Sequence, residues 1–78
     1  MTEAYVHVTV EDRKHREAIS EFRKYDEIKN SVSVIGGYGD GLLLNVKTNN
    51  NEELERVLSR IKKSPYVSKI SNWFVVEL

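Results

Sequence analysis

A strict alternation of apolar and polar side chains opens the chain, over residues 4–10. Successive side chains of a strand point to opposite sides of a sheet, so this two-residue period predicts a strand with one buried side. The apolar side consists of Val6, Val8 and Val10, and the other side of Tyr5, His7 and Thr9. The register of this strand is therefore restricted, because a shift by one residue would expose every valine.

Three later segments also have a pattern typical of strands, and two segments with a helical pattern lie between the strands. Apolar side chains recur at helical spacing in two charged stretches. The two apolar stripes are His15, Ala18, Ile19 and Phe22, and Leu54, Val57, Leu58 and Ile61. We predict a helix within residues 11–25, strands at 27–35 and 42–47, a helix at 50–63 and a strand at 67–78.

Helix-starting and helix-stopping residues flank the second helical pattern. Asn50 stands three residues before Glu53, which is the spacing of a capping box at a helix start. Pro65 follows the pattern and disfavours a helical conformation in the residue before it. This helix is therefore predicted to begin near Asn50 and to end before Pro65.

In the later strands, alternate residues are again predicted to point to opposite sides of the sheet, which we call their parity. In the second strand, one side carries Ile28, Val32 and Val34. In the third strand, one side carries Leu42, Leu44 and Val46. In the last strand, one side carries Ile70, Asn72, Phe74 and Val76, and the other carries Trp73 and Val75.

The order strand, helix, strand, strand, helix, strand defines the fold class. Residues 36–41 make too short a connection for a parallel crossover, which needs about a dozen residues, so the middle strands form an antiparallel hairpin. Two β-α-β halves joined in this way form a ferredoxin-like α+β fold, β-α-β-β-α-β. We expect a single domain over residues 1–78, with a four-stranded antiparallel sheet and two helices on one of its faces.

The face of the sheet opposite the helices is predicted to be too apolar for contact with water. By parity it carries five large or apolar side chains, Tyr5, His7, Leu43, Trp73 and Val75. Exposed apolar patches of this size mark interaction sites, and two copies can bury such faces by stacking about 10 Å apart. These five residues are therefore predicted to form a homodimer interface.

Composition excludes several classes of function. Twelve Lys and Arg balance twelve Asp and Glu, so the chain lacks the positive charge that direct nucleic-acid binding usually uses. It contains no cysteine, hence no disulfide or zinc-thiolate site. Its apolar runs are too short to span a membrane, and no signal peptide opens it. We expect a cytoplasmic domain that binds no membrane.

No catalytic or metal-binding constellation is present in the sequence. None of the serines stands in a nucleophile-elbow pattern, and the glutamates near residue 53 resemble the charged side of a helix. His7 has no second ligand at metal-binding spacing. We therefore predict a protein that is not an enzyme and that holds no metal or cofactor.

The segment 36–41 contains all four glycines of the chain and allows two interpretations. The glycines can supply the backbone angles of a wide hairpin turn, with Asp40 solvated. Alternatively, exposed backbone N–H groups and Asp40 can line a pocket for a small molecule, since bare backbone approaches a ligand closely. Neither a P-loop nor a dinucleotide fingerprint is present.

RNA binding is a further alternative, because ferredoxin-like sheets can present aromatic side chains that stack on bases. Tyr5 and Trp73 could serve in that role. The third strand, however, carries no aromatic residue and no basic residue before Lys47, unlike an RNA-recognition motif. This alternative is therefore the weaker one.

Four segments, in this order, resemble the effector-binding domain of the Lrp/AsnC family of prokaryotic regulators, the RAM domain. They are residues 4–8, the strand and loop at 32–38, the strand at 42–46, and the turn at 65–71. The second segment is similar to the strand that leads into the family's Gly-x-Tyr-Asp loop. Nearly the whole chain is covered by the resemblance.

The resemblance implies a ferredoxin-like fold that dimerises through its sheet and assembles further into rings or octamers. It implies an amino acid or related small molecule as effector, bound between dimers. By position, the effector-binding residues are Gly36, Gly37, Tyr38, Gly39 and Asp40, together with Asn72, where the family often has threonine. The loop is longer than the family's, and Tyr66 replaces the glycine of the family's turn.

The function expected from these observations is regulatory. No helix-turn-helix segment precedes residue 1, so we expect a stand-alone module that modulates transcription through a full-length Lrp/AsnC-type regulator. Two alternatives stay open: a pure oligomerisation domain without ligand, and an ACT-like regulatory domain that acts on a metabolic enzyme. An isomerase or monooxygenase of the same fold is a more distant alternative, in which His7 is the one histidine placed to act in a catalytic site.

Overall fold

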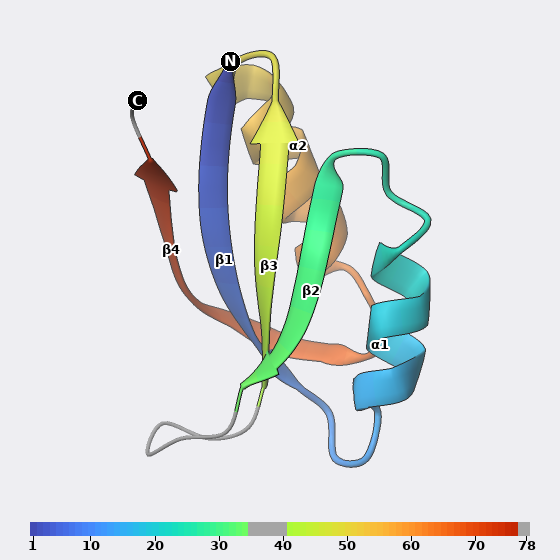
Figure 1. Cartoon of the computed structure of the whole chain (residues 1–78). Helices are drawn as coiled ribbons and strands as arrows, with labels where there is room; N and C mark the ends of the chain where they lie inside the picture. Colours follow the sequence, from blue (N-terminus) through green and yellow to red (C-terminus); the bar gives the residue numbers. More distant parts are fainter. Residues whose placement is uncertain (35–40, 77–78) are drawn as a thin grey trace.

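Strand β1 (Thr2–Val10) is the strand on which the sheet is built, because it has a neighbour on each side. The computed structural model describes residues 1–34 and 41–76. β1 pairs antiparallel with β3 (Gly41–Thr48) and with β4 (Val67–Val76). β2 (Ile28–Val34) pairs antiparallel with β3, so the order across the sheet is β2-β3-β1-β4 (Figure 1).

The two helices, α1 (His15–Phe22) and α2 (Asn51–Lys62), lie on one side of this sheet. In Figure 1, α2 lies behind the sheet and α1 lies beside it along β2. Both helices contribute buried side chains to the same core. The α+β ferredoxin-like fold, with its antiparallel β2–β3 pair, is therefore confirmed.

The core lies between the sheet and the helices and contains the side chains that the alternation predicts for β1 and β3. Their buried members are Ala4, Val6, Val8, Val10, Leu42, Leu44 and Val46. The helices close this layer with Ala18, Phe22, Leu54, Val57 and Ile61. The predicted parity of β1 and β3 is thus confirmed.

The predicted parity of β4 is wrong in its second half. The register pairs His7 with Asn72 but Val8 with Ile70, so Ser71 is an extra residue in a β-bulge. A bulge shifts the alternation by one, and directly opposed residues share a side of the sheet. Trp73 therefore points to the helix side, opposite Val6.

The residues that follow the bulge in β4 change sides with Trp73. Val75 is opposite the buried Ala4 on the helix side, whereas Phe74 is opposite Tyr5 on the other side. The rings of Phe74 and Tyr5 are 5.8 Å apart, which confirms this placement. The predicted position of Trp73 and Val75 on the face opposite the helices is therefore corrected, and Phe74 takes that position.

A second irregularity corrects the parity of β2. Ile28 pairs with Val46, and the next pairing joins Asn30 to Asn45, so the register shifts by one between them. Ile28 is buried on the helix side, while Val32 is opposite Leu43 and is 52% exposed on the other side. Ile28 and Val32 thus lie on opposite sides of the sheet.

The predicted N-cap, Asn50, is present at the start of α2. Its side-chain oxygen accepts a hydrogen bond from the backbone N–H of Glu53 at 2.9 Å, which satisfies a donor that the first helical turn leaves free. The Glu53 carboxylate accepts a bond from the backbone N–H of Asn49 at 2.8 Å, one residue before the position that a capping box uses.

Replacing Asn50 with alanine should lower the free energy of unfolding by about 1 kcal/mol, because the backbone N–H of Glu53 loses its acceptor. Chemical denaturation measures this difference. Glu55→Ala is the matched control, since Glu55 is an exposed residue inside the same helix. Equal stabilities of the two variants would contradict the role of the cap.

Candidate functional site: the uncovered face of the sheet

The side of the sheet turned away from the helices carries side chains from all four strands. We call it the uncovered face, and the register places on it Tyr5, His7, Thr9, Val32, Leu43, Asn45, Lys69, Asn72 and Phe74, with Glu3 and Lys47 at one end. It faces the viewer in Figure 1. Of the five predicted interface residues, Tyr5, His7 and Leu43 lie on it, and Trp73 and Val75 do not.

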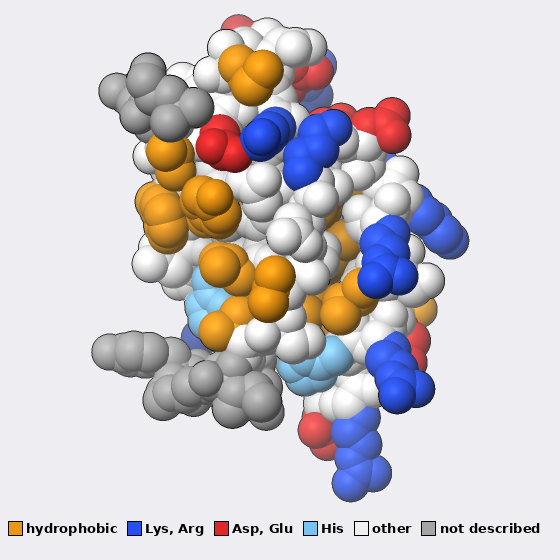
Figure 2. Space-filling model, in the orientation of Figure 1, with side chains coloured by type: hydrophobic (Ala, Val, Ile, Leu, Met, Phe, Trp, Pro, Cys, Tyr) orange, Lys and Arg blue, Asp and Glu red, His pale blue; other side chains and the backbone are white. Residues whose placement is uncertain are grey.

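Apolar groups on the uncovered face form two rows across the strands. The first row runs from Val32 through Leu43 to His7, and the second joins Tyr5 to Phe74. Phe74 is 54% exposed, so a large part of its ring faces solvent. Figure 2 shows hydrophobic side chains gathered over this face beside a histidine. A monomer leaves this apolar area in contact with water.

One end of the uncovered face is polar. Glu3 accepts a hydrogen bond from the Asn45 amide at 3.1 Å, and its carboxylate is 3.5 Å from the ammonium group of Lys47. These side chains come from the neighbouring strands β1 and β3. Together they place a charged rim beside the apolar rows, which is the usual anatomy of a protein interface.

His7 occupies the middle of the uncovered face, between Leu43 on β3 and Asn72 on β4. Its Nε2 atom is buried and has no hydrogen-bond partner among the residues that the structure describes. A buried polar atom without a partner lowers stability unless a ligand or another chain supplies the missing bond. His7 therefore carries a buried nitrogen whose hydrogen bond is unsatisfied within the described residues.

The bulge in β4 brings further polar groups next to His7. The hydroxyl groups of Thr9 and Ser71 are hydrogen-bonded to each other, and the backbone N–H of Trp73 donates to the Asn72 side chain at 2.9 Å. Asn72 is the one predicted effector-binding residue that the structure describes. The other five, Gly36, Gly37, Tyr38, Gly39 and Asp40, lie outside the described residues.

The sequence reasoning missed Phe74 and Val32 as members of this face. The run Trp73–Val76 is apolar throughout, so it contains no polar residue from which its parity could be recognised. The adjacent polar residues Ser71 and Asn72 interrupt the alternation and are the one local signal of the bulge. Parity alone cannot locate an inserted residue.

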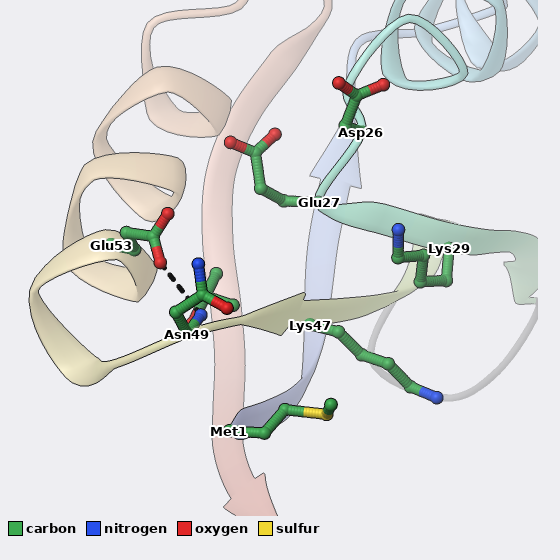
Figure 3. A pocket seen from close by; sticks show the side chains of 8 residues that line it. Met1, Asp26, Glu27, Lys29, Lys47, Asn49 and Glu53 are labelled. Atoms are coloured by element: carbon green, nitrogen blue, oxygen red, sulfur yellow. Dashed lines mark hydrogen bonds between the residues drawn. The ribbon is translucent and has the colours of Figure 1, made fainter.

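A pocket of about 360 Å³ lies away from the uncovered face, at the start of β2 (Figure 3). Acidic side chains from Asp26, Glu27 and Glu53 and basic ones from Lys29 and Lys47 line it. Charges of both signs are what a zwitterionic amino acid requires of its site. Glu53 serves the helix cap there, as the dashed line in Figure 3 indicates.

Within residues 1–34 and 41–76, no group of three or more histidine or acidic side chains is placed to hold a metal ion. No helix in the described part of the chain is long and apolar enough to cross a membrane.

Comparison with known families and structures identifies the class of domain. The Lrp/AsnC ligand-binding domain matches residues 3–77, so the chain belongs to that family. The family is a regulatory ligand-binding domain of transcription-factor-like proteins and not an enzyme family. The resemblance noted in the sequence is thereby confirmed. No curated protein gives a significant match.

Two solved structures show the same fold. The crystal structure of FFRP-DM1 aligns with a TM-score of 0.89 at 20% identity and covers 99% of this chain and 100% of its own. The hypothetical protein PHS023 from Pyrococcus horikoshii aligns with a TM-score of 0.88 at 22% identity, over 100% of this chain and 92% of its own. At these identities the likeness establishes the fold alone.

Gly41→Ala should lower the free energy of unfolding by about 2 kcal/mol, as overpacked positions do. A Cβ atom at Gly41 would overlap the carbonyl oxygen of Val8 and lie 3.1 Å from Nε2 of His7. Thermal or chemical unfolding measures the change. Ser33→Ala, at an exposed strand position, is the control. A Gly41→Ala variant as stable as this control would contradict the close approach of β1 and β3.

Proposed function

We propose that residues 1–78 form one regulatory domain that dimerises through the uncovered face. The observation that carries this proposal is the apolar surface of Val32, Leu43, Tyr5 and Phe74 on the side of the sheet without helices. Stacking two such faces would bury both apolar areas. A stable interface needs about 800 Å² from each partner, which a four-stranded sheet can supply.

Two adjacent aromatic residues allow a sharp test of this interface. Phe74 and Trp73 are similarly exposed, at 54% and 46%, but they point to opposite sides of β4. Phe74→Lys should place a charge in the dimer interface and weaken dimerisation by about 30-fold or more, equivalent to about 2 kcal/mol. Trp73→Lys should leave the dimer nearly unchanged.

Sedimentation velocity over a range of protein concentrations measures both dissociation constants. The unfolding temperature of each variant is recorded in parallel, so that a folding defect is not mistaken for dissociation. If Trp73→Lys dissociates the dimer and Phe74→Lys does not, the interface lies on the helix side of β4. A monomeric wild-type protein at micromolar concentrations would also overturn the proposal.

We propose further that the domain binds an amino acid or related small effector and modulates transcription through a full-length Lrp/AsnC-type regulator. Membership in a ligand-binding family supports the effector. A regulator with the same kind of domain could co-assemble with this chain through the same uncovered face. The glycine-rich segment 36–41 and Asn72 are the proposed effector-binding residues.

The twenty amino acids, each tested in a thermal-shift assay, provide the effector test. A ligand at 100 times its dissociation constant stabilises the folded state by about 2.7 kcal/mol, which raises the unfolding temperature visibly. We expect at least one such shift, and Asp40→Ala should abolish it because the loop loses its carboxylate.

Asp26→Ala is the matched control, because Asp26 lines the pocket at the start of β2. Loss of the shift in Asp26→Ala, with Asp40→Ala unaffected, would move the effector to that pocket. No shift from any amino acid, in a protein that still dimerises, would favour the pure oligomerisation domain.

A further inference from the structure

The bulge in β4 leaves an apolar surface on the helix side of the sheet. Trp73 and Val75 are 46% and 40% exposed there. Their opposed partners on β1, Val6 and Ala4, are fully buried. The helical layer therefore covers the middle of the sheet but does not cover the second half of β4.

A groove of about 540 Å³ runs between α2 and β4 at this place. Apolar side chains of Leu58, Ile70 and Trp73 line it, and Leu58 and Ile70 are partly buried against the core. A half-exposed tryptophan beside aliphatic groups is the kind of pocket in which interface anchors are found.

The charges of this groove have one sign. Lys62 from α2 and Lys69 from β4 line it, and its remaining residues are serines and an asparagine. Among the described residues the ion pair is that of Glu3 with Lys47, so neither groove lysine has a carboxylate partner there. In a chain with equal numbers of acidic and basic residues, this groove is a local site of positive charge.

We propose that this groove docks an acidic segment of a partner protein. One apolar side chain of that segment would pack against Trp73, between Leu58 and Ile70. Flanking carboxylates would pair with Lys62 and Lys69. Charge complementarity selects this occupant, because the groove combines an apolar floor with two ammonium groups that have no carboxylate partner in residues 1–34 and 41–76.

Other occupants fit the groove less well. If two copies paired through this groove about a two-fold axis, the partner's groove would offer lysines and no lining carboxylate to pair with them. A nucleic acid gains its affinity from many phosphate contacts, whereas two lysines line this groove. A protein segment needs one anchor and a few charges, which the groove supplies.

Trp73, the proposed anchor of the groove, points to the helix side of β4, away from the proposed dimer interface. Lys69 and Asn72 line the groove but are opposite Thr9 and His7, so they also border the uncovered face. The groove and the dimer interface therefore meet along β4, and the two proposals rest on different aromatic residues. Failure of either proposal would not decide the other.

Trp73 is the only tryptophan of the chain, so its fluorescence reports directly on the groove. The full chain is titrated with a synthetic peptide, acetyl-Asp-Glu-Leu-Glu-Asp-amide. A saturable change in the emission of Trp73 is expected, and it should weaken when salt rises from about 50 to about 300 mM. A peptide with lysine in place of each acidic residue should bind at least about tenfold more weakly.

Two double variants with the same change in charge separate the groove from the rest of the surface. Lys62→Glu with Lys69→Glu should weaken binding of the acidic peptide by at least about tenfold. Lys14→Glu with Lys24→Glu changes two exposed lysines that do not line the groove, and binding should be nearly unchanged. Sedimentation and thermal unfolding confirm that all variants fold and assemble alike.

Four results would overturn the proposal. They are the absence of a saturable change up to millimolar peptide, equal binding of acidic and basic peptides, equal weakening by both double variants, and tighter binding of a single-stranded oligodeoxynucleotide. The last result would assign the groove to nucleic acid.

Discussion

The burial of one side of β1 is the constraint on which the rest of the structure depends. Its helix-side residues Ala4, Val6, Val8 and Val10 are buried, and the strand pairs with both β3 and β4. Because the register of β1 admits no slip, the opposite side must present Tyr5 and His7 away from the core. The uncovered face is thus a direct consequence of the packing that stabilises the fold.

The fold was predictable from the sequence because its strongest patterns lie in its central elements. β1 and β3 alternate regularly, α2 has an apolar stripe and the N-cap residue Asn50, and each of these features is observed. Each of these elements buries one side only, so the spacing of apolar and polar residues in the sequence follows the period of the strand or helix. The two outer strands, β2 and β4, are the elements whose faces were predicted wrongly.

The errors in the outer strands have a common physical cause. An outer strand pairs on one edge, so it tolerates an inserted residue more readily than a strand held on both edges. The insertion in β4 exchanges the sides of Trp73 and Phe74, and the shift in β2 does the same for Val32. No polar residue stands within Trp73–Val76 to reveal the exchange. The fold class survives such shifts, but the composition of a binding surface does not.

The second half of β4 carries exposed apolar residues on both of its sides, and the size of the chain accounts for this. A domain of 78 residues can enclose one core layer, and about 60–65% of its unfolded surface is buried on folding. Helix α2 covers the central strands and leaves Trp73 and Val75 exposed, while Phe74 is exposed on the uncovered face. An apolar strand that its own chain leaves uncovered gains stability from any molecule that covers it. Two sides of one strand can then serve two different partners, since the bulge assigns neighbouring aromatic residues to opposite sides of the sheet.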